Sequence, residues 1–180
     1  MINSKLVLAS ILSFLFMLIS ISCKKSIAGT QSDEISVHTD TINTDISKTD
    51  IKNLKYVDYV LSEASTEIIT DWAKFFEIQA QIDVLKNANL SFFNDNSTAL
   101  ISLLEDFKND IPSALNDTII IVRLKVIESL FYRLEDMMNY NISKEETINQ
   151  IKDILIANSN LIDQINKKVE KDQQNIINPY

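Results

Sequence analysis

Residues 143–172 read SKEETINQIKDILIANSNLIDQINKKVEKD and carry the clearest helical pattern in the chain. Apolar residues return every three or four positions, which is the repeat of one face of an α-helix. Ser143 and Glu146 have the spacing of a capping box, so we expect a helix from there to about Asp172. The apolar face contains one polar member, Asn158, and consists of Ile148, Ile151, Leu155, Asn158, Ile162, Ile165 and Val169.

A similar repeat at residues 51–88 predicts a first long helix, which should end in the Asn-rich region 87–96. Its face is broken only by Asp71 and consists of Leu54, Val57, Leu61, Ala64, Ile68, Asp71, Phe75, Ile78, Ile82 and Leu85. If the first and last helices are antiparallel neighbours, Asp71 and Asn158 lie at similar heights. A hydrogen bond between these two polar residues would fix the register of the two helices.

Two shorter helices are predicted between the long ones. The first begins at Asn96 or Ser97 and ends before Pro112, because a proline pushes the preceding residue out of the helical region. The second begins at Asn116 or Asp117 and continues to about Met138. The run Ile119–Val122 alone would favour a strand, but the spacing downstream of it favours a helix.

The predicted fold is therefore all-α: a four-helix, mostly antiparallel bundle over residues 51–172, with long first and last helices. From residue 51 onward the sequence has no Gly, whereas sheet proteins usually need Gly in their turns. Residues 173–180 are expected to fray. Residues 23–50 are polar and show no lasting period, so they are expected to form a flexible tether before the bundle.

The N-terminus contains an apolar run, Leu6–Ile21, which is followed by Ser22, Cys23, Lys24 and Lys25. The run is shorter than the roughly 20 residues of a membrane-spanning helix and is typical of the core of a signal peptide. An uncleaved membrane helix is the alternative. Lys24 and Lys25 disfavour it, because basic residues rarely follow the exported end of such a helix.

The stretch from Ile19 to Lys25 resembles the cleavage region of bacterial lipoproteins, in particular those of the Bacteroidota. Ser22 and Cys23 match that pattern, while Ser20 stands where an aliphatic residue is usual. The resemblance implies that residues 1–22 are a signal peptide and that Cys23 becomes the lipidated N-terminus, which attaches the protein to a membrane of the cell envelope. Bacteroidota lipoproteins that are exported to the cell surface often carry acidic residues directly after the Cys. Here Lys24 and Lys25 follow Cys23, so the resemblance implies a protein that is attached to the outer membrane and faces the periplasm.

Composition excludes several classes of function. The 180 residues include 17 basic and 25 acidic side chains, and a net charge of -8 argues against nucleic acid as a partner. A single Cys, a single His and a single Gly exclude an internal disulfide, a multi-histidine metal centre and a glycine-rich phosphate loop. No cofactor is expected.

Glu63, Glu67 and Asp71 are spaced four residues apart, which places three like charges along one ridge of the predicted first helix. Such a ridge can bind calcium or magnesium through carboxylate oxygens, or it can be a solvated acidic face. Phe92 and Phe93 stand in a polar connection. They either cover the end of the bundle or present an apolar anchor to a partner.

These features favour a lipid-anchored envelope protein that binds another protein as a scaffold, adaptor or inhibitor, rather than an enzyme. One alternative is a metal-binding protein or enzyme that uses the carboxylates of Glu63, Glu67 and Asp71. The other is a structural stalk, in which the first and last helices extend into a homodimeric coiled coil.

Overall fold

The structure is a computed structural model that describes residues 46–94, 96–140 and 142–177. Over these residues it is all-helical and has no strand, which confirms the predicted all-α class. Cys23, the predicted signal peptide and the tether up to residue 45 lie outside the described residues. The α-helices are α2 (Lys48–Lys52), α3 (Glu63–Ile69), α4 (Ala73–Lys86), α5 (Ser97–Asn109), α6 (Thr118–Met138) and α7 (Lys144–Ile177), with short 3₁₀ turns at Ser91–Phe93 and Ser113–Leu115.

Helix α7 begins where its sequence predicts. The Ser143 hydroxyl oxygen accepts a hydrogen bond from the Glu146 amide at 3.2 Å, and the Glu146 carboxylate accepts one from the Ser143 amide at 3.3 Å. Two amides that have no partner within the helix are thereby satisfied. The helix continues to Ile177, five residues beyond its predicted end at Asp172, and residues 178–180 lie outside the described residues.

The two middle helices also begin and end close to the predicted positions. Asp117 caps α6, because its carboxylate accepts hydrogen bonds from the amides of Ile119 and Ile120 at 2.8 and 3.1 Å. Helix α5 starts at Ser97 and ends at Asn109, three residues before Pro112. The run Ile119–Val122 is helical, as the spacing downstream of it predicts.

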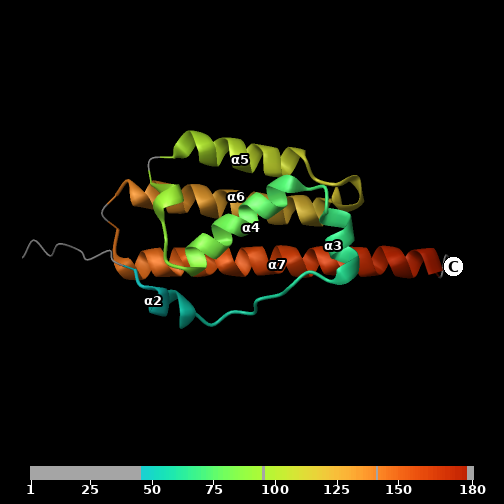
Figure 1. The fold of residues 1–180 in the computed structure, drawn as a ribbon, viewed down its shortest axis with the longest axis horizontal. Helices are drawn as coiled ribbons and strands as arrows, with labels where there is room; N and C mark the ends of the chain where they lie inside the picture. The colour runs from blue at the N-terminus through green and yellow to red at the C-terminus, as the bar shows by residue number, and fades with distance from the viewer. Residues whose placement is uncertain (1–45, 95, 141, 178–180) are drawn as a thin grey trace, which may run out of the picture. The chain divides into compact units, whose positions relative to one another are not determined.

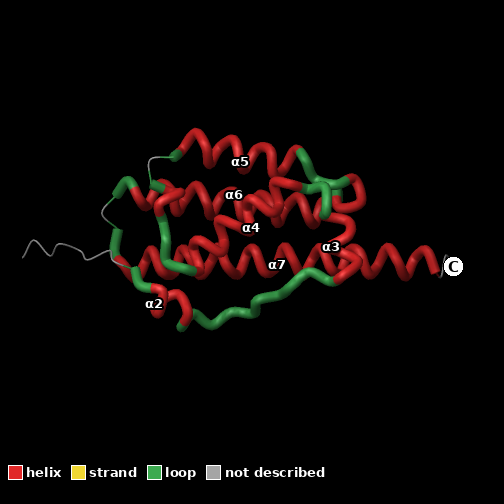
Figure 2. Tube along the Cα trace, viewed as in Figure 1, coloured by secondary structure: helices red, strands yellow, loops and turns green. Residues whose placement is uncertain are grey.

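Figure 1 shows α5, α6 and α7 alongside one another, with α4 crossing them obliquely. Figure 2 shows the same view with the connecting loops set apart from the helices. The core contains large apolar side chains, and the largest fully buried ones are Trp72, Phe75, Phe93, Phe107 and Phe131. Trp72 stacks on Phe107 with ring centroids 4.9 Å apart, and its indole N–H donates to the Phe107 carbonyl at 3.1 Å.

The predicted long first helix is wrong. Residues 54–62, which we call the strap, have no regular secondary structure and run alongside α7 from α2 to α3 (Figure 1). Helix begins again only at Glu63, where the Ser62 hydroxyl accepts a hydrogen bond from the Ser65 amide at 3.1 Å. A second break at residues 70–72 separates α3 from α4. The hypothesis of a homodimeric stalk required two long helices, and the structure has only one of them, α7, among the described residues.

Side chains of α7 explain why the strap is not helical. Ser159 accepts a hydrogen bond from the Tyr59 amide at 3.0 Å and donates one to the Val57 carbonyl at 2.5 Å. Further along the strap, the Asn166 carboxamide accepts a hydrogen bond from the Ser62 amide at 2.9 Å and donates one to the Val60 carbonyl at 2.8 Å. These contacts satisfy backbone groups that a helix would otherwise satisfy. The β-branched and aromatic residues of the strap also favour extended backbone.

The spacing of the two contacts along the strap matches their spacing along α7. Ser159 and Asn166 are seven residues apart, and seven helical residues rise about 10 Å. Val57 and Val60 are three residues apart, which is also about 10 Å in an extended chain.

The predicted tether is too long at its C-terminal end. Ile46 is buried, and Ser47 and Asp50 form a capping box at the start of α2, with the Asp50 carboxylate accepting from the Ser47 amide at 2.8 Å. Asp50 also pairs with Lys144 at the start of α7 at 2.8 Å. Residues 46–50 therefore belong to the helical domain rather than to the tether.

Among the described residues, no helix combines the length and the apolar character needed to cross a membrane. The apolar run Leu6–Ile21 is outside that part of the chain.

Candidate functional site

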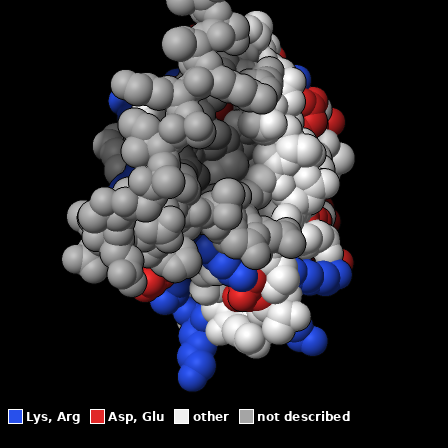
Figure 3. All heavy atoms as spheres, turned by 90° about the vertical axis from the view of Figure 1, so that its left-hand side faces the viewer, with Lys and Arg blue, Asp and Glu red and all other residues white. Residues whose placement is uncertain are grey.

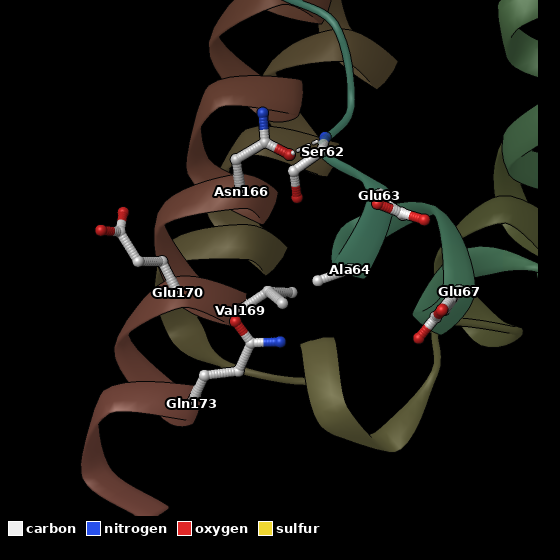
Figure 4. Close-up of a pocket in the computed structure, with 8 residues that line it drawn as sticks. All are labelled: Ser62, Glu63, Ala64, Glu67, Asn166, Val169, Glu170 and Gln173. Carbon is white, nitrogen blue, oxygen red and sulfur yellow. Dashed lines mark hydrogen bonds between the residues drawn. The ribbon is translucent and has the colours of Figure 1, made fainter. Parts of the chain in front are cut away.

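A cleft of about 500 Å³ lies between α3 and α7 (Figure 4). Two of the predicted ridge residues, Glu63 and Glu67, line it from the side of α3, and Glu170 lines it from α7. Figure 4 shows Ala64 and Val169 facing one another across the cleft. The middle of the cleft is therefore apolar, and its carboxylates lie at the rim.

The carboxylates of this cleft do not converge on one point. Glu170 is directed away from α3 in Figure 4, and Asp71 is not among the lining residues. Asp71 lies exposed in the turn after α3 rather than on the ridge of a continuous helix. Within the described ranges, no three His, Cys, Asp or Glu side chains are close enough together to hold a metal ion. The hypothesis of a metal site at Glu63, Glu67 and Asp71 therefore loses its geometric basis.

The polar residue of the α7 face has a different partner from the one predicted. The Asn158 carboxamide exchanges two hydrogen bonds with Gln79 of α4, at 2.8 and 3.0 Å. The predicted pair of Asp71 and Asn158 is wrong, because the break before α4 moves Asp71 to the surface. Asn158 is only 2% exposed, so this amide pair links α4 to α7 inside the protein.

Gln79 and Asn158 line a small pocket of about 220 Å³ that lies between the strap, α4 and α7. Asp58 of the strap accepts a hydrogen bond from the Lys86 ammonium at 2.8 Å. Burial lowers the pKa of Lys86, whereas this hydrogen bond and the nearby negative charges raise it. Together the raising effects are the larger, so the pKa lies above its ordinary value. Burial raises the pKa of the neighbouring Tyr56 phenol. Lys86 therefore stays charged and fastens the strap to α4.

Phe92 and Phe93 cover the core rather than forming an exposed anchor. Phe93 is fully buried, and its ring meets that of Phe131 edge-on with centroids 5.3 Å apart. Phe92 is half-buried and packs against Phe93 in the same manner. Of the two alternatives for this pair, the structure therefore favours the one in which it closes the end of the core, and the predicted partner anchor is wrong for Phe93.

Exposed apolar side chains form a row along α6. Ile119, Val122 and Val126 are 52%, 50% and 40% exposed. Their spacing of three and four residues places them on one side of the helix, opposite the buried Ile120, Leu124 and Ile127. We call these three residues the α6 row. Sequence reasoning missed it because the run Ile119–Val122 was weighed only as strand or helix, and Val126 was not considered.

Sequence reasoning also missed Ser159 and Asn166, the two α7 residues that hold the strap. Their spacing of seven residues was a usable signal, because it places two polar side chains on one face of a helix, two turns apart. The sequence analysis considered Asn158, which lies on the apolar face of this helix, and did not consider the neighbouring side that contains Ser159 and Asn166.

No protein-family model matches the chain, and no curated protein and no solved structure matches it either. Arguments about function therefore rest on the residues and the geometry of the chain itself.

Proposed function

We propose that this is a lipid-anchored envelope protein, attached through Cys23 to the outer membrane on its periplasmic face. We propose further that it acts without catalysis, as a scaffold, adaptor or inhibitor that binds another protein through its helical domain. The lone cysteine at the end of an apolar run supports the anchor, because Cys23 matches the lipidation site of the lipoproteins that this stretch resembles.

The observation that carries the binding function is the α6 row. Three β-branched side chains, each at least 40% exposed, form a continuous apolar strip on a long helix. Such strips bind a partner by burying apolar surface, at roughly 25 cal/mol for each Å² removed from water. The side chains around the row, Lys125 and Ser129 among them, are exposed and polar, as at the rim of many protein interfaces.

The finer architecture belongs to this proposal. We infer that α5, α6 and α7 pack as antiparallel neighbours, since short connections join consecutive helices. The divided first helix leaves α4 as the fourth member of the bundle. In this arrangement the α6 row lies on a rigid scaffold, which favours a binding surface of fixed shape.

The anchor is tested by the intact mass of the mature protein extracted from membranes of an expressing cell. The proposal expects a chain that begins at Cys23 and carries a diacylglyceryl group, and the modification should be lost in Cys23→Ser. An unmodified chain that still begins at Met1 would contradict the anchor and would indicate that Leu6–Ile21 is an ordinary membrane helix.

The binding surface is tested with a photo-reactive residue placed at position 122 in living cells. We expect a specific cross-linked product, and we expect Ile119→Ser combined with Val126→Ser to abolish it. The matched control carries the photo-reactive residue at position 101 of α5, where Ile101 is similarly exposed. A product of equal strength at both positions would contradict a specific role of the α6 row. A product with the mass of two chains would identify the partner as a second copy.

A further inference from the structure

We propose that α2 and the strap form a docking face for an anionic lipid surface, which positions the helical domain on the membrane that carries its anchor. The face consists of the outward side chains Lys48, Lys52, Lys55, Val57, Tyr59 and Val60, and we call it the basic face. The proposal rests on the proposed anchor at Cys23, because the anchor brings this face to the lipid.

Charge is the first argument for the basic face. Lys48, Lys52 and Lys55 are exposed and form no ion pair within the described part of the chain. Both acidic residues of the same segment are neutralised by lysines of other helices. Asp50 pairs with Lys144 of α7 and Asp58 pairs with Lys86 of α4, each at 2.8 Å. A protein with a net charge of -8 therefore presents a locally positive surface here, and lysines near an anionic bilayer are attracted to it.

The side chains between these lysines and α3 suit the interface of a bilayer. Val57 and Val60 are 62% and 79% exposed, and Val60 has the largest exposed fraction among the large apolar residues that the structure describes. Tyr59, 41% exposed, has an apolar ring and a polar hydroxyl, a combination that is enriched at the level of lipid headgroups. The backbone contacts with Ser159 and Asn166 hold this segment on α7, so the side chains are displayed without a change in fold.

The position of the basic face along the chain is the third argument. It begins directly after Ile46, and only 22 residues separate Ile46 from Cys23, so the linking chain spans at most about 80 Å. Figure 3 looks onto the end of the molecule where α2 lies and shows Lys and Arg side chains projecting along its lower edge, with Asp and Glu side chains beside them. A face that is tethered this closely meets the lipid at a high effective concentration, so individually weak contacts suffice.

The lone cysteine allows a direct experiment on the chain from Cys23 to Tyr180. The Cys23 thiol is coupled to a maleimide lipid in vesicles of phosphatidylcholine alone or of equal parts phosphatidylcholine and phosphatidylglycerol. Hydrogen exchange of the strap amides is then measured. Val60 and Leu61 have no hydrogen-bond partner for their amides within the described residues, so they should exchange fast in the absence of lipid.

We expect exchange of the strap amides to slow several-fold on the anionic vesicles and to stay unchanged on the neutral ones. The variant Lys48→Gln, Lys52→Gln, Lys55→Gln should lose this protection. The matched control, Lys125→Gln, Arg133→Gln, Lys171→Gln, removes three exposed positive charges elsewhere on the protein and should keep it. All substituted side chains are exposed, and a thermal melt of each variant confirms that it folds.

Unchanged exchange on the anionic vesicles would overturn the proposal, as would equal protection on both kinds of vesicle. Equal loss of protection in the variant of Lys48, Lys52 and Lys55 and in the matched control would also overturn it. Protection that appears only when an envelope protein is added would assign the face to a protein partner instead. The coupling supplies the anchor chemically, so this result is independent of the mass measurement that tests lipidation of Cys23 in the cell.

Discussion

The strap and α7 lie beside one another and have a similar spacing of apolar residues, yet only α7 is a helix. In α7 the backbone groups are satisfied within the helix from Lys144 onward, after a capping box. In the strap, the amides of Tyr59 and Ser62 donate to side chains of α7 instead. The comparison shows that a heptad-like pattern leads to a helix only where no neighbouring element offers the backbone other partners.

The largest effect is expected at Trp72, where the region of the strap and α3 joins α4. Its side chain is fully buried, stacks on Phe107 and donates to the Phe107 carbonyl. Trp72→Ala should lower the free energy of unfolding by about 3–5 kcal/mol, because it leaves a large cavity. Chemical denaturation measures this loss. Trp72→Phe, which keeps most of the ring, should cost clearly less, and equal losses would show that ring packing at this junction contributes little.

A smaller loss is expected for the amide pair of Gln79 and Asn158, which lies next to the strap. Asn158→Ala removes two hydrogen bonds and leaves the Gln79 carboxamide without its partner, which costs about 1–3 kcal/mol. Asp71→Ala, at the exposed position that a continuous first helix would have placed beside Asn158, should change stability by no more than about 0.5 kcal/mol. Thermal or urea unfolding of both variants compares them, and a larger loss for Asp71→Ala would support a continuous first helix.

The end of α4 offers a stabilising change. Ala88 has a φ of 60°, in the left-handed region, while the Asn89 amide donates to the Val84 carbonyl at 3.1 Å. This is the position after a helix where glycine is preferred, because a Cβ there clashes with the backbone. Ala88→Gly should therefore stabilise the protein by about 1 kcal/mol. The control Ala80→Gly, at an exposed position inside α4, should destabilise it by about 1 kcal/mol.

The smallest effect concerns pH and the attachment of α2. The hydrogen bond from Lys144, followed by those from the Ser47 side chain and amide, lowers the pKa of Asp50 from 3.8 to about 2. Since the folded pKa lies below the unfolded one, the stabilisation is fully present above about pH 3.8 and is lost as the pH falls through 2. A carboxyl titration by NMR should give that midpoint. In Lys144→Met the midpoint should rise towards the ordinary value, and an unchanged midpoint would argue against the ion pair.

The sequence predicts the parts of the fold in which local signals and tertiary packing agree. Ser143 with Glu146, and Asp117, define the starts of α7 and α6 because each cap is made by residues within three positions of it. The strap was not predictable from local pattern, since Ser159 and Asn166 act on it from about 100 residues away. The prediction for Asp71 failed at a second break. The carboxylate ridge required a helix that continues past Ile69, but the chain turns at residues 70–72, where the Trp72 indole N–H donates to the Phe107 carbonyl, 35 residues away in the sequence.

The central claim is that side chains of α7 form hydrogen bonds with the strap backbone, which replace the hydrogen bonds of a helix. Amide hydrogen exchange across residues 54–62 tests this claim most directly. The account predicts slow exchange at Tyr59 and Ser62, whose amides donate to Ser159 and Asn166 at 3.0 and 2.9 Å, and fast exchange at Val60 and Leu61 between them. Asn166→Ala should release Ser62 while leaving Tyr59 protected. Uniformly slow exchange over residues 54–62, as in a continuous helix, would contradict the account.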